Sequence, residues 1–177
     1  TDLRYFLKDF DKINLISSHN LGFGYSNNLG VHNAKTPYIF ILSPDIFFSI
    51  ASLKKLYIEF LSYENAGVVG PSLYDENNKR RTNSSLSFLK QKIYRNNFQR
   101  NIYKNLNKNL AEGNISCDYI IGCAMLFKRS FFIEIGGFDE RFFIYYEDND
   151  ICDRIWQSNK MVLEIPSSKM IHLQGKS

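Results

Sequence analysis

The sequence predicts an α/β fold, with a mainly parallel sheet flanked by helices. Short continuous apolar runs, typical of strands buried on both faces, alternate along the chain with stretches of helical periodicity. The chain has 177 residues, of which 44% are hydrophobic and 15% aromatic. This length and composition fit one globular domain over residues 1–177 with a substantial core and exclude a disordered protein.

The elements expected in the first half follow from apolar spacing. Apolar side chains recur at helical intervals in residues 3–10 and 52–63. Residues 19–30 are rich in Gly, Asn and Ser and are expected to be a loop that leads into a helix. Three short strands are expected at residues 13–18, 37–42 and 66–69, the last ending at Gly70-Pro71.

The second half repeats this alternation. Residues 119–127 read as a strand with small residues at its middle, and residues 130–135 as a helix closed by Gly136-Gly137. A helix over residues 148–159 follows. Two strands, residues 161–165 and 170–173, are expected on either side of Pro166.

A basic insert at about residues 77–114 interrupts this pattern. Residues 79–108 hold nine Lys and Arg residues and no acidic residue, with aromatic residues between them. A solvated surface excursion is the favoured interpretation. The alternative is a peripheral contact with an anionic lipid or membrane face.

Charge and cysteine content narrow the function classes. The net charge of +4 is too mild to indicate a nucleic-acid partner. Three cysteines at irregular spacing give neither a disulfide framework nor a zinc pattern, so reduced, buried thiols in a cytosolic protein are expected. No stretch is long and apolar enough to span a bilayer.

Candidate catalytic carboxylates follow an aromatic run. Glu147, Asp148 and Asp150 come directly after residues 142–146, FFIYY. Carboxylates in a partly buried cleft can act as bases near neutral pH. The alternative is a helix start, where the helix dipole favours acidic residues.

A metal site is predicted at one rim of the sheet. Asp45 follows a buried strand, and His172 lies at the end of the last expected strand. Ligands of open α/β sheets bind beyond the carboxyl ends of strands, and such donors suit Mg²⁺ or Mn²⁺. Asp45 could equally cap a helix, and His172 could be a core or surface histidine.

Several motifs in order resemble bacterial family 2 glycosyltransferases of the GT-A fold, in particular their rhamnosyltransferase-like branch. The loop at residues 20–30 is similar to its Asn-x-Gly-Phe-x-x-x-Asn-x-Gly, and Ser43-Pro44-Asp45 to its Asn-Pro-Asp. Residues 122–126 match its Gly-Ala-Ala-Met-Leu strand. Residues 136–150 match its Gly-Gly-Phe-Asp-Glu and Glu-Asp-x-Asp signature, and Ile171-His172 its late Ile-His.

The resemblance implies an inverting glycosyltransferase that moves a sugar, rhamnose being one candidate, from a nucleotide-sugar to a glycan or lipid-linked acceptor. Its base would be Asp148, beside Glu147. Asp45 and His172 would hold a divalent metal on the donor diphosphate. Donor contacts would also come from Gly22, Gly24 and Asn28. The resemblance further suggests Tyr146 and Trp156 on the acceptor side, with packing favoured for Trp156.

The same resemblance implies cytoplasmic surface-polysaccharide synthesis, at the inner face of a membrane. The family opens with a strand-helix-strand unit that is not seen before Thr1, so we expect a fragment of a longer enzyme. Two alternatives remain open: a non-catalytic carbohydrate- or lipid-binding remnant of the same fold, and, more weakly, a nucleotidyltransferase on a related sheet. Ser43 in place of the family's Asn makes strict metal dependence an open question.

Overall fold

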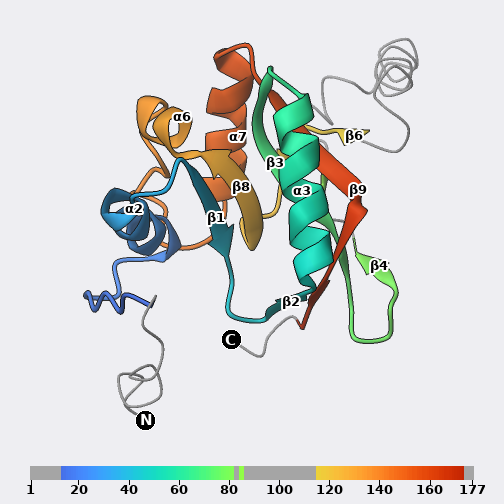
Figure 1. Ribbon diagram of the computed structural model, residues 1–177. Helices are drawn as coiled ribbons and strands as arrows, with labels where there is room; N and C mark the ends of the chain where they lie inside the picture. Colours follow the sequence, from blue (N-terminus) through green and yellow to red (C-terminus); the bar gives the residue numbers. More distant parts are fainter. Residues whose placement is uncertain (1–12, 82–83, 86–114, 174–177) are drawn as a thin grey trace.

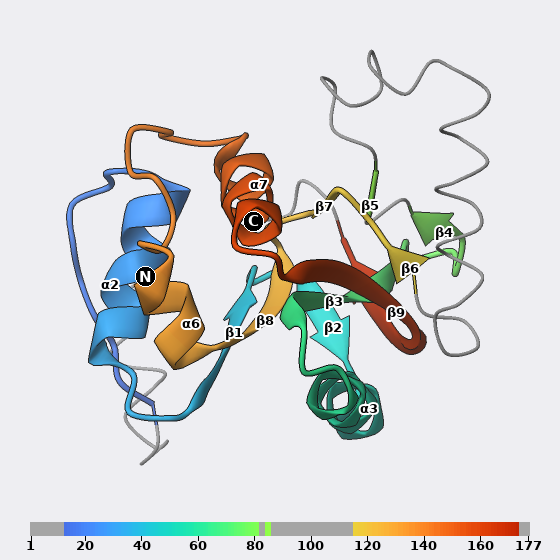
Figure 2. The same cartoon turned by 90° about the horizontal axis from the view of Figure 1, so that it is seen from above.

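A computed structural model describes residues 13–81, 84–85 and 115–173, and these build a main sheet between two layers of helices (Figures 1 and 2). Its main strands lie in the order β1-β8-β3-β9-β2, with β4 (Arg80–Arg81) beside β3 and β6 (Ile115–Ser116) beside β9. A separate pair is formed by β5 (Ser84–Ser85) and β7 (Tyr119–Ile120). The expected α/β class is confirmed.

The sheet divides the core into two layers. Val68 and Val69, neighbours on β3 (Ala66–Tyr74), point to opposite faces, as adjacent strand residues must. Val68 packs with Ile151 and Ile155 of α7 (Glu147–Gln157), whereas Val69 packs on the face covered by α3 (Ile50–Ser62). Helices α2 (Phe23–Asn33) and α6 (Arg129–Glu134) contribute to the α7 layer.

Two helices confirm the expected periodicity. In α3, the expected helix at residues 52–63, Leu56 and Phe60 are buried, and Ser49 caps the helix by accepting a hydrogen bond from the Ser52 N–H. In α7, Ile151 and Ile155 are buried one turn apart. Helix α6 ends before Gly136-Gly137, as expected from the glycine pair.

The strand directions differ from the prediction. Strand β8 (Ala124–Lys128) runs antiparallel to both β1 (Tyr38–Leu42) and β3, and β2 (Ile46–Phe48) runs antiparallel to β9 (Met161–His172). Among the described strands only β3 and β9 pair in parallel, so the sheet is mixed. Helices on both faces bury antiparallel strands as well as parallel ones, and an apolar run therefore does not fix direction.

Several element boundaries also differ. Residues 13–18 form no strand and are exposed, and α2 begins inside the stretch expected to be a loop. Strands β3 and β9 continue through Pro71 and Pro166, with a shift in their mutual register after Pro71. The strand expected at residues 119–127 is divided by a turn at Gly122-Cys123. The expected helix at residues 3–10 and most of the basic insert lie outside the described residues.

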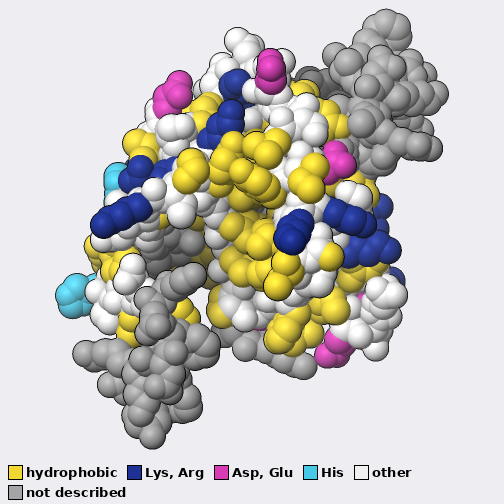
Figure 3. Space-filling view, in the orientation of Figure 1, with side chains coloured by type: hydrophobic (Ala, Val, Ile, Leu, Met, Phe, Trp, Pro, Cys, Tyr) yellow, Lys and Arg dark blue, Asp and Glu magenta, His cyan; other side chains and the backbone are white. Residues whose placement is uncertain are grey.

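One face of the molecule exposes apolar side chains over β1 and α3 (Figure 3). Ile58 and Leu61 of α3 and Leu42 of β1 are among the exposed side chains. In the part of the chain that the structure describes, no helix has the length and apolar character needed to cross a membrane.

Candidate functional site

Asp45 and His172 meet at one end of the sheet. Ile46 of β2 pairs with His172 of β9, and the Leu173 N–H donates to the Asp45 carbonyl over 3.1 Å. These backbone contacts bring the His172 Nε2 to 3.3 Å from the Asp45 Oδ2, with side chains 13% and 5% exposed. The convergence expected from their places in the sequence is present.

A cation would fit beside this pair. The other carboxylate oxygen of Asp45, Oδ1, is buried and has no hydrogen-bond partner among the described residues. A buried, unpaired carboxylate oxygen is costly unless a cation or donor reaches it. No cluster of three or more His, Cys, Asp or Glu suited to a metal exists in the described ranges. Asp45 and His172 could therefore supply two ligands, and substrate phosphate and water would fill the remaining positions.

Asp148 lies in the first turn of α7, with its carboxylate held by backbone donors. Its Oδ2 accepts from the Gly122 N–H over 3.0 Å, and its Oδ1 accepts from the Asn149 N–H over 2.9 Å. Burial raises the pKa of Asp148 above its usual value, although these hydrogen bonds oppose the shift. A raised pKa makes the carboxylate a stronger base, which suits proton abstraction.

Glu147 is more deeply placed than its neighbour. It is 5% exposed, and its Oε2 is buried without a hydrogen-bond partner in the described part. Burial, together with the nearby charge of Asp148, raises the pKa of Glu147. This carboxylate is less accessible to a substrate than that of Asp148.

The turn at Gly122-Cys123 joins the two groups of side chains. Gly122 donates to Asp148, while the Cys123 carbonyl accepts from the Ser43 N–H over 2.9 Å, two residues before Asp45. The Cys123 Sγ lies 3.9 Å from the His172 Nδ1. Burial and the Asp45 charge raise the pKa of the Cys123 thiol to about 12, so it is protonated at neutral pH. One short turn therefore fixes both the candidate base and the candidate metal ligands.

Gly22 and Gly24 allow close packing at the start of α2. Gly22 has φ +109°, and a Cβ there would overlap the backbone of Phe143. The Phe23 N–H donates to the Phe143 carbonyl over 2.9 Å. A Cβ on Gly24 would lie 3.0 Å from the Phe138 Cβ. Both glycines thus bring α2 against residues 138–143, and donor contact by them stays a prediction.

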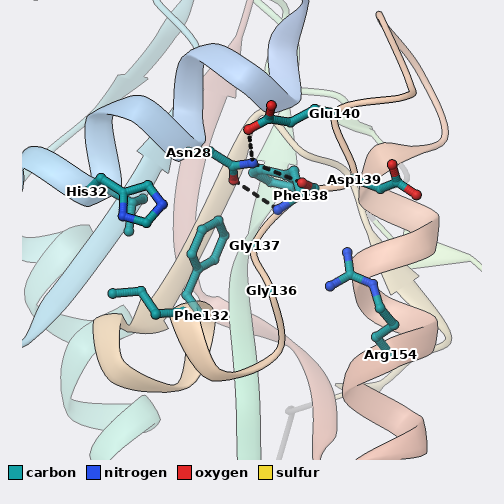
Figure 4. Close-up of a pocket in the computed structure, with 11 residues that line it drawn as sticks. Asn28, His32, Phe132, Gly136, Gly137, Phe138, Asp139, Glu140 and Arg154 are labelled. Carbon is teal, nitrogen blue, oxygen red and sulfur yellow. Dashed lines mark hydrogen bonds between the residues drawn. The ribbon is translucent and has the colours of Figure 1, made fainter.

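Asn28 is a buried clamp (Figure 4). Its Nδ2 donates to the Phe138 carbonyl and to the Glu140 Oε1, each over 2.9 Å, and its Oδ1 accepts from the Phe138 N–H over 2.9 Å. The expected donor-binding asparagine therefore has both ends of its amide engaged in holding the Gly136–Glu140 turn, which favours a positioning role.

A pocket of about 530 Å³ adjoins this clamp (Figure 4). The Arg154 guanidinium at its side is held by the Asp150 Oδ2 over 2.6 Å and donates to the Ile135 carbonyl. The pocket lining does not include Asp45, Asp148 or His172. This cavity is therefore separate from the candidate chemistry.

The sequence did not predict the backbone conformation of Tyr145 and Tyr146. Tyr145 and Tyr146 both adopt left-handed conformations, with φ 70° and 71°, immediately before Glu147. No sequence signal pointed to this, because left-handed residues are most often Gly, Asn or Asp.

Trp156 packs against the core and donates from Nε1 to the carbonyls of Cys117 and Asp118, which supports the packing role favoured for it.

A family model and named relatives both match the chain as a glycosyltransferase sequence. The model of a family described as "Glycosyltransferase like family 2" matches residues 6–176. The chain is 26% identical over 179 residues to the Escherichia coli protein "Rhamnosyltransferase WbbL", covering 96% of the chain and 67% of that protein. It is 37% identical over 59 residues to the Mycobacterium tuberculosis "N-acetylglucosaminyl-diphospho-decaprenol L-rhamnosyltransferase", a match that spans 33% of the chain and 19% of that protein.

Solved structures share the fold. A crystal structure of GalNAc-T7 with UDP, GalNAc and Mn²⁺ matches with TM-score 0.69 and 16% identity, over 98% of the chain and 36% of that protein. The mannosyltransferase PcManGT from Pyrobaculum calidifontis, in complex with GDP-Man and Mn²⁺, matches with TM-score 0.61 and 16% identity, over 99% and 46%. Both are glycosyltransferases of the GT-A fold, so these likenesses confirm that fold for the chain.

Proposed function

Because the chain belongs to the glycosyltransferase like family 2, as its match over residues 6–176 shows, we propose that it is the catalytic part of an inverting glycosyltransferase. One observation carries the proposal. The Asp148 carboxylate has a raised pKa and accepts a hydrogen bond from the Gly122 N–H, and in the same turn the Cys123 Sγ lies 3.9 Å from the His172 Nδ1. A base and a cation-binding pair on one rim are what displacement of a diphosphate requires.

The substrates are proposed from the relatives. Two of them are named rhamnosyltransferases, which supports L-rhamnose as the donor sugar, carried on a nucleotide. The mycobacterial name also specifies N-acetylglucosamine on a lipid diphosphate, and we propose an acceptor of this lipid-linked class. Work at the cytoplasmic face of a membrane, in surface-polysaccharide synthesis, follows from the same resemblance.

In the proposed reaction Asp148 accepts the proton of the acceptor hydroxyl. The acceptor oxygen forms a bond to the anomeric carbon while the bond between that carbon and the diphosphate oxygen breaks, which inverts the configuration. A cation bound by Asp45 and His172 would neutralise charge on the departing diphosphate. Gly122 holds the carboxylate in place, because its N–H donates to Asp148.

The test is transfer by the full-length protein carrying Asp148→Asn. This substitution keeps the side-chain shape and removes the basicity, so we expect a rate loss of about 10²–10⁴. Asp153→Asn, five residues further along α7, is the matched control and should transfer at the parent rate. Transfer by the Asp148→Asn protein at the parent rate would refute the assignment.

Metal binding is tested separately, by relaxation of water protons around added Mn²⁺. We expect Asp45→Asn and His172→Ala each to weaken Mn²⁺ binding, since each removes one of the two ligands proposed among the described residues. Asp139→Asn is the control, because the Asp139 carboxylate is already paired with Arg141. Unchanged Mn²⁺ binding in the Asp45→Asn protein would refute the proposed metal site.

A further inference from the structure

The end of strand β9 exposes a basic and an apolar side chain. Near the start of β9, Val162 packs in the core layer of α7. Further along the strand, Ser168 and Met170 are buried, whereas Lys169 and Ile171 are exposed. Met170 belongs to the layer under α3, so its neighbours Lys169 and Ile171 point to the opposite face of the sheet. The described helices cover that face near the start of β9 and leave it open at the end.

Neighbouring strands extend this open surface across the sheet. Phe47 of β2 is the register partner of Ile171 on one side, and Tyr74 of β3 is its partner on the other. Residues paired in register lie on the same face. Phe47 is 56% exposed and Ile171 40%. The three side chains form an apolar and aromatic row at the end of the sheet that carries Asp45 and His172, where β2 lies beside β9 (Figure 1).

A pocket of about 370 Å³ opens at this row, between β2, β9 and the end of β3. Its walls are largely apolar and include Phe47, Phe48 and Ile171. Among the described residues that line it, Lys169 is the only one with a charged side chain. We name this cavity the β2–β9 pocket. Apolar walls with a single cation match an amphiphile that has an anionic head group.

The charge of Lys169 is available to such a head group. Its Nζ lies 5.4 Å from the centre of the Tyr74 ring, a cation–π contact that keeps the ammonium at the pocket. Within the described ranges no carboxylate forms an ion pair with Lys169. The two arginines of β4, by contrast, are each paired with a carboxylate. Lys169 is therefore the cation of this surface that an anion can reach without displacing an acidic partner.

We propose that the β2–β9 pocket is a membrane-docking site that takes an anionic phospholipid, with its acyl chain along Phe47 and Ile171 and its phosphate at Lys169. A soluble anion gains nothing from the exposed apolar row, whereas a lipid uses both features. The inference deepens the proposed function, on whose location at a membrane it rests, and it uses residues separate from the basic insert. Docking here holds Asp45 and His172 close to the bilayer, where a lipid-linked acceptor resides.

Docking is tested by sedimentation of the full-length protein with vesicles of phosphatidylcholine alone or of equimolar phosphatidylcholine and phosphatidylglycerol. We expect the parent to bind the anionic vesicles more tightly. Lys169→Gln should weaken that binding about fivefold, since a basic residue near an anionic bilayer contributes about 1 kcal/mol. Ile171→Thr keeps a β-branched side chain but removes apolar surface, so it should also weaken binding several-fold. Equal binding of the parent to both kinds of vesicle would overturn the inference.

Two variants elsewhere on the surface are matched controls. Lys160→Gln makes the same charge change directly before β9, at the opposite end of the strand from Lys169. Ile133→Thr makes the same apolar change on α6, at a residue that is 40% exposed like Ile171. Both controls should bind anionic vesicles as the parent does. Losses as large as those of the pocket variants would show that binding depends on overall charge and apolar surface, and the pocket would be refuted.

Phe47→Trp reports on the pocket directly. The new indole should be quenched by vesicles that contain brominated phosphatidylglycerol. The parent supplies the background signal of Trp156, which packs against the core. Quenching no stronger than in the parent would contradict lipid entry. Self-association of the parent that Lys169→Gln abolishes, without vesicle binding by either protein, would assign the pocket to a second copy of the chain and also overturn the inference.

Vesicle binding requires no sugar transfer, so its outcome is independent of the catalytic assignment. If the parent transfers sugar and Lys169→Gln binds vesicles as tightly as the parent, the docking site is wrong and the enzyme assignment stands. If Asp148→Asn transfers at the parent rate while Lys169→Gln loses vesicle binding, the catalytic base is wrong and the docking site stands.

Discussion

Gly22→Ala should destabilise the protein by a predictable amount. Gly22 has φ +109° and ψ 173°, a region used almost only by glycine, and a residue with a Cβ there costs about 1–3 kcal/mol. The new Cβ would also lie 2.9 Å from the Phe143 Cα and carbonyl carbon, backbone atoms that move only with their segment. That movement disrupts the hydrogen bond from the Phe23 N–H, worth about 0.5–1.5 kcal/mol net.

The two contributions add to about 1.5–4.5 kcal/mol of unfolding free energy. For a domain of this size 1 kcal/mol shifts the melting temperature by about 2–4 °C, so we expect a decrease of about 3–18 °C. Differential scanning calorimetry measures it.

Gly30→Ala is the matched control with the opposite sign. Gly30 lies inside α2, and a Cβ there would meet nothing within 4 Å. Alanine in a helix interior is favoured over glycine by about 1 kcal/mol, so this variant should melt about 2–4 °C higher. A Gly22→Ala protein that melts with the parent, or shifts in the same direction as Gly30→Ala, would refute the reasoning.

Three further outcomes are expected. Burial raises the pKa of Glu147 from 4.5, so the stabilising contribution of this residue is complete below pH 4.5 and is lost as pH rises through the folded pKa. Glu147→Gln should therefore raise the melting temperature more at pH 8 than at pH 4. An equal shift at both pH values would contradict the burial argument. Asn28→Ala removes three hydrogen bonds and leaves the buried Phe138 N–H unpaired, so we expect a loss of about 2–4 kcal/mol in urea unfolding, against less than about 0.5 kcal/mol for Asn33→Ala, whose bond is exposed. The Cys123 thiol, with a pKa of about 12 and 6% exposure, should resist iodoacetamide at pH 8 until urea unfolds the protein; rapid labelling of the folded protein would show that the site opens.

The sequence predicted those elements whose apolar spacing matches their packing. Leu56 and Phe60 in α3, and Ile151 and Ile155 in α7, are spaced by about one turn and are buried, so periodicity located both helices. Helix α2 was expected to begin later, because its buried positions include Gly24 and Asn28, which carry no apolar signal.

The site was predicted in part. The meeting of Asp45 and His172 followed from strand ends on a common rim, and the structure places them together. The amide network of Asn28 depends on contact with residues 138–140, which no local pattern encodes. The conformation of Tyr145 and Tyr146 runs against intrinsic preference, and such tertiary overrides are expected where a site is built.

The candidate site is assembled from segments far apart along the chain, and this has a consequence for how the protein folds. Asn28 bonds to a residue 110 positions away, and Ser168 bonds to the Ser52 carbonyl across 116 positions. Closing such long loops costs entropy before any contact repays it, so folding is expected to be slow relative to helical proteins of similar size. His172 ends the last strand, β9, so a nascent chain cannot bring this side chain to Asp45 until that strand has been added.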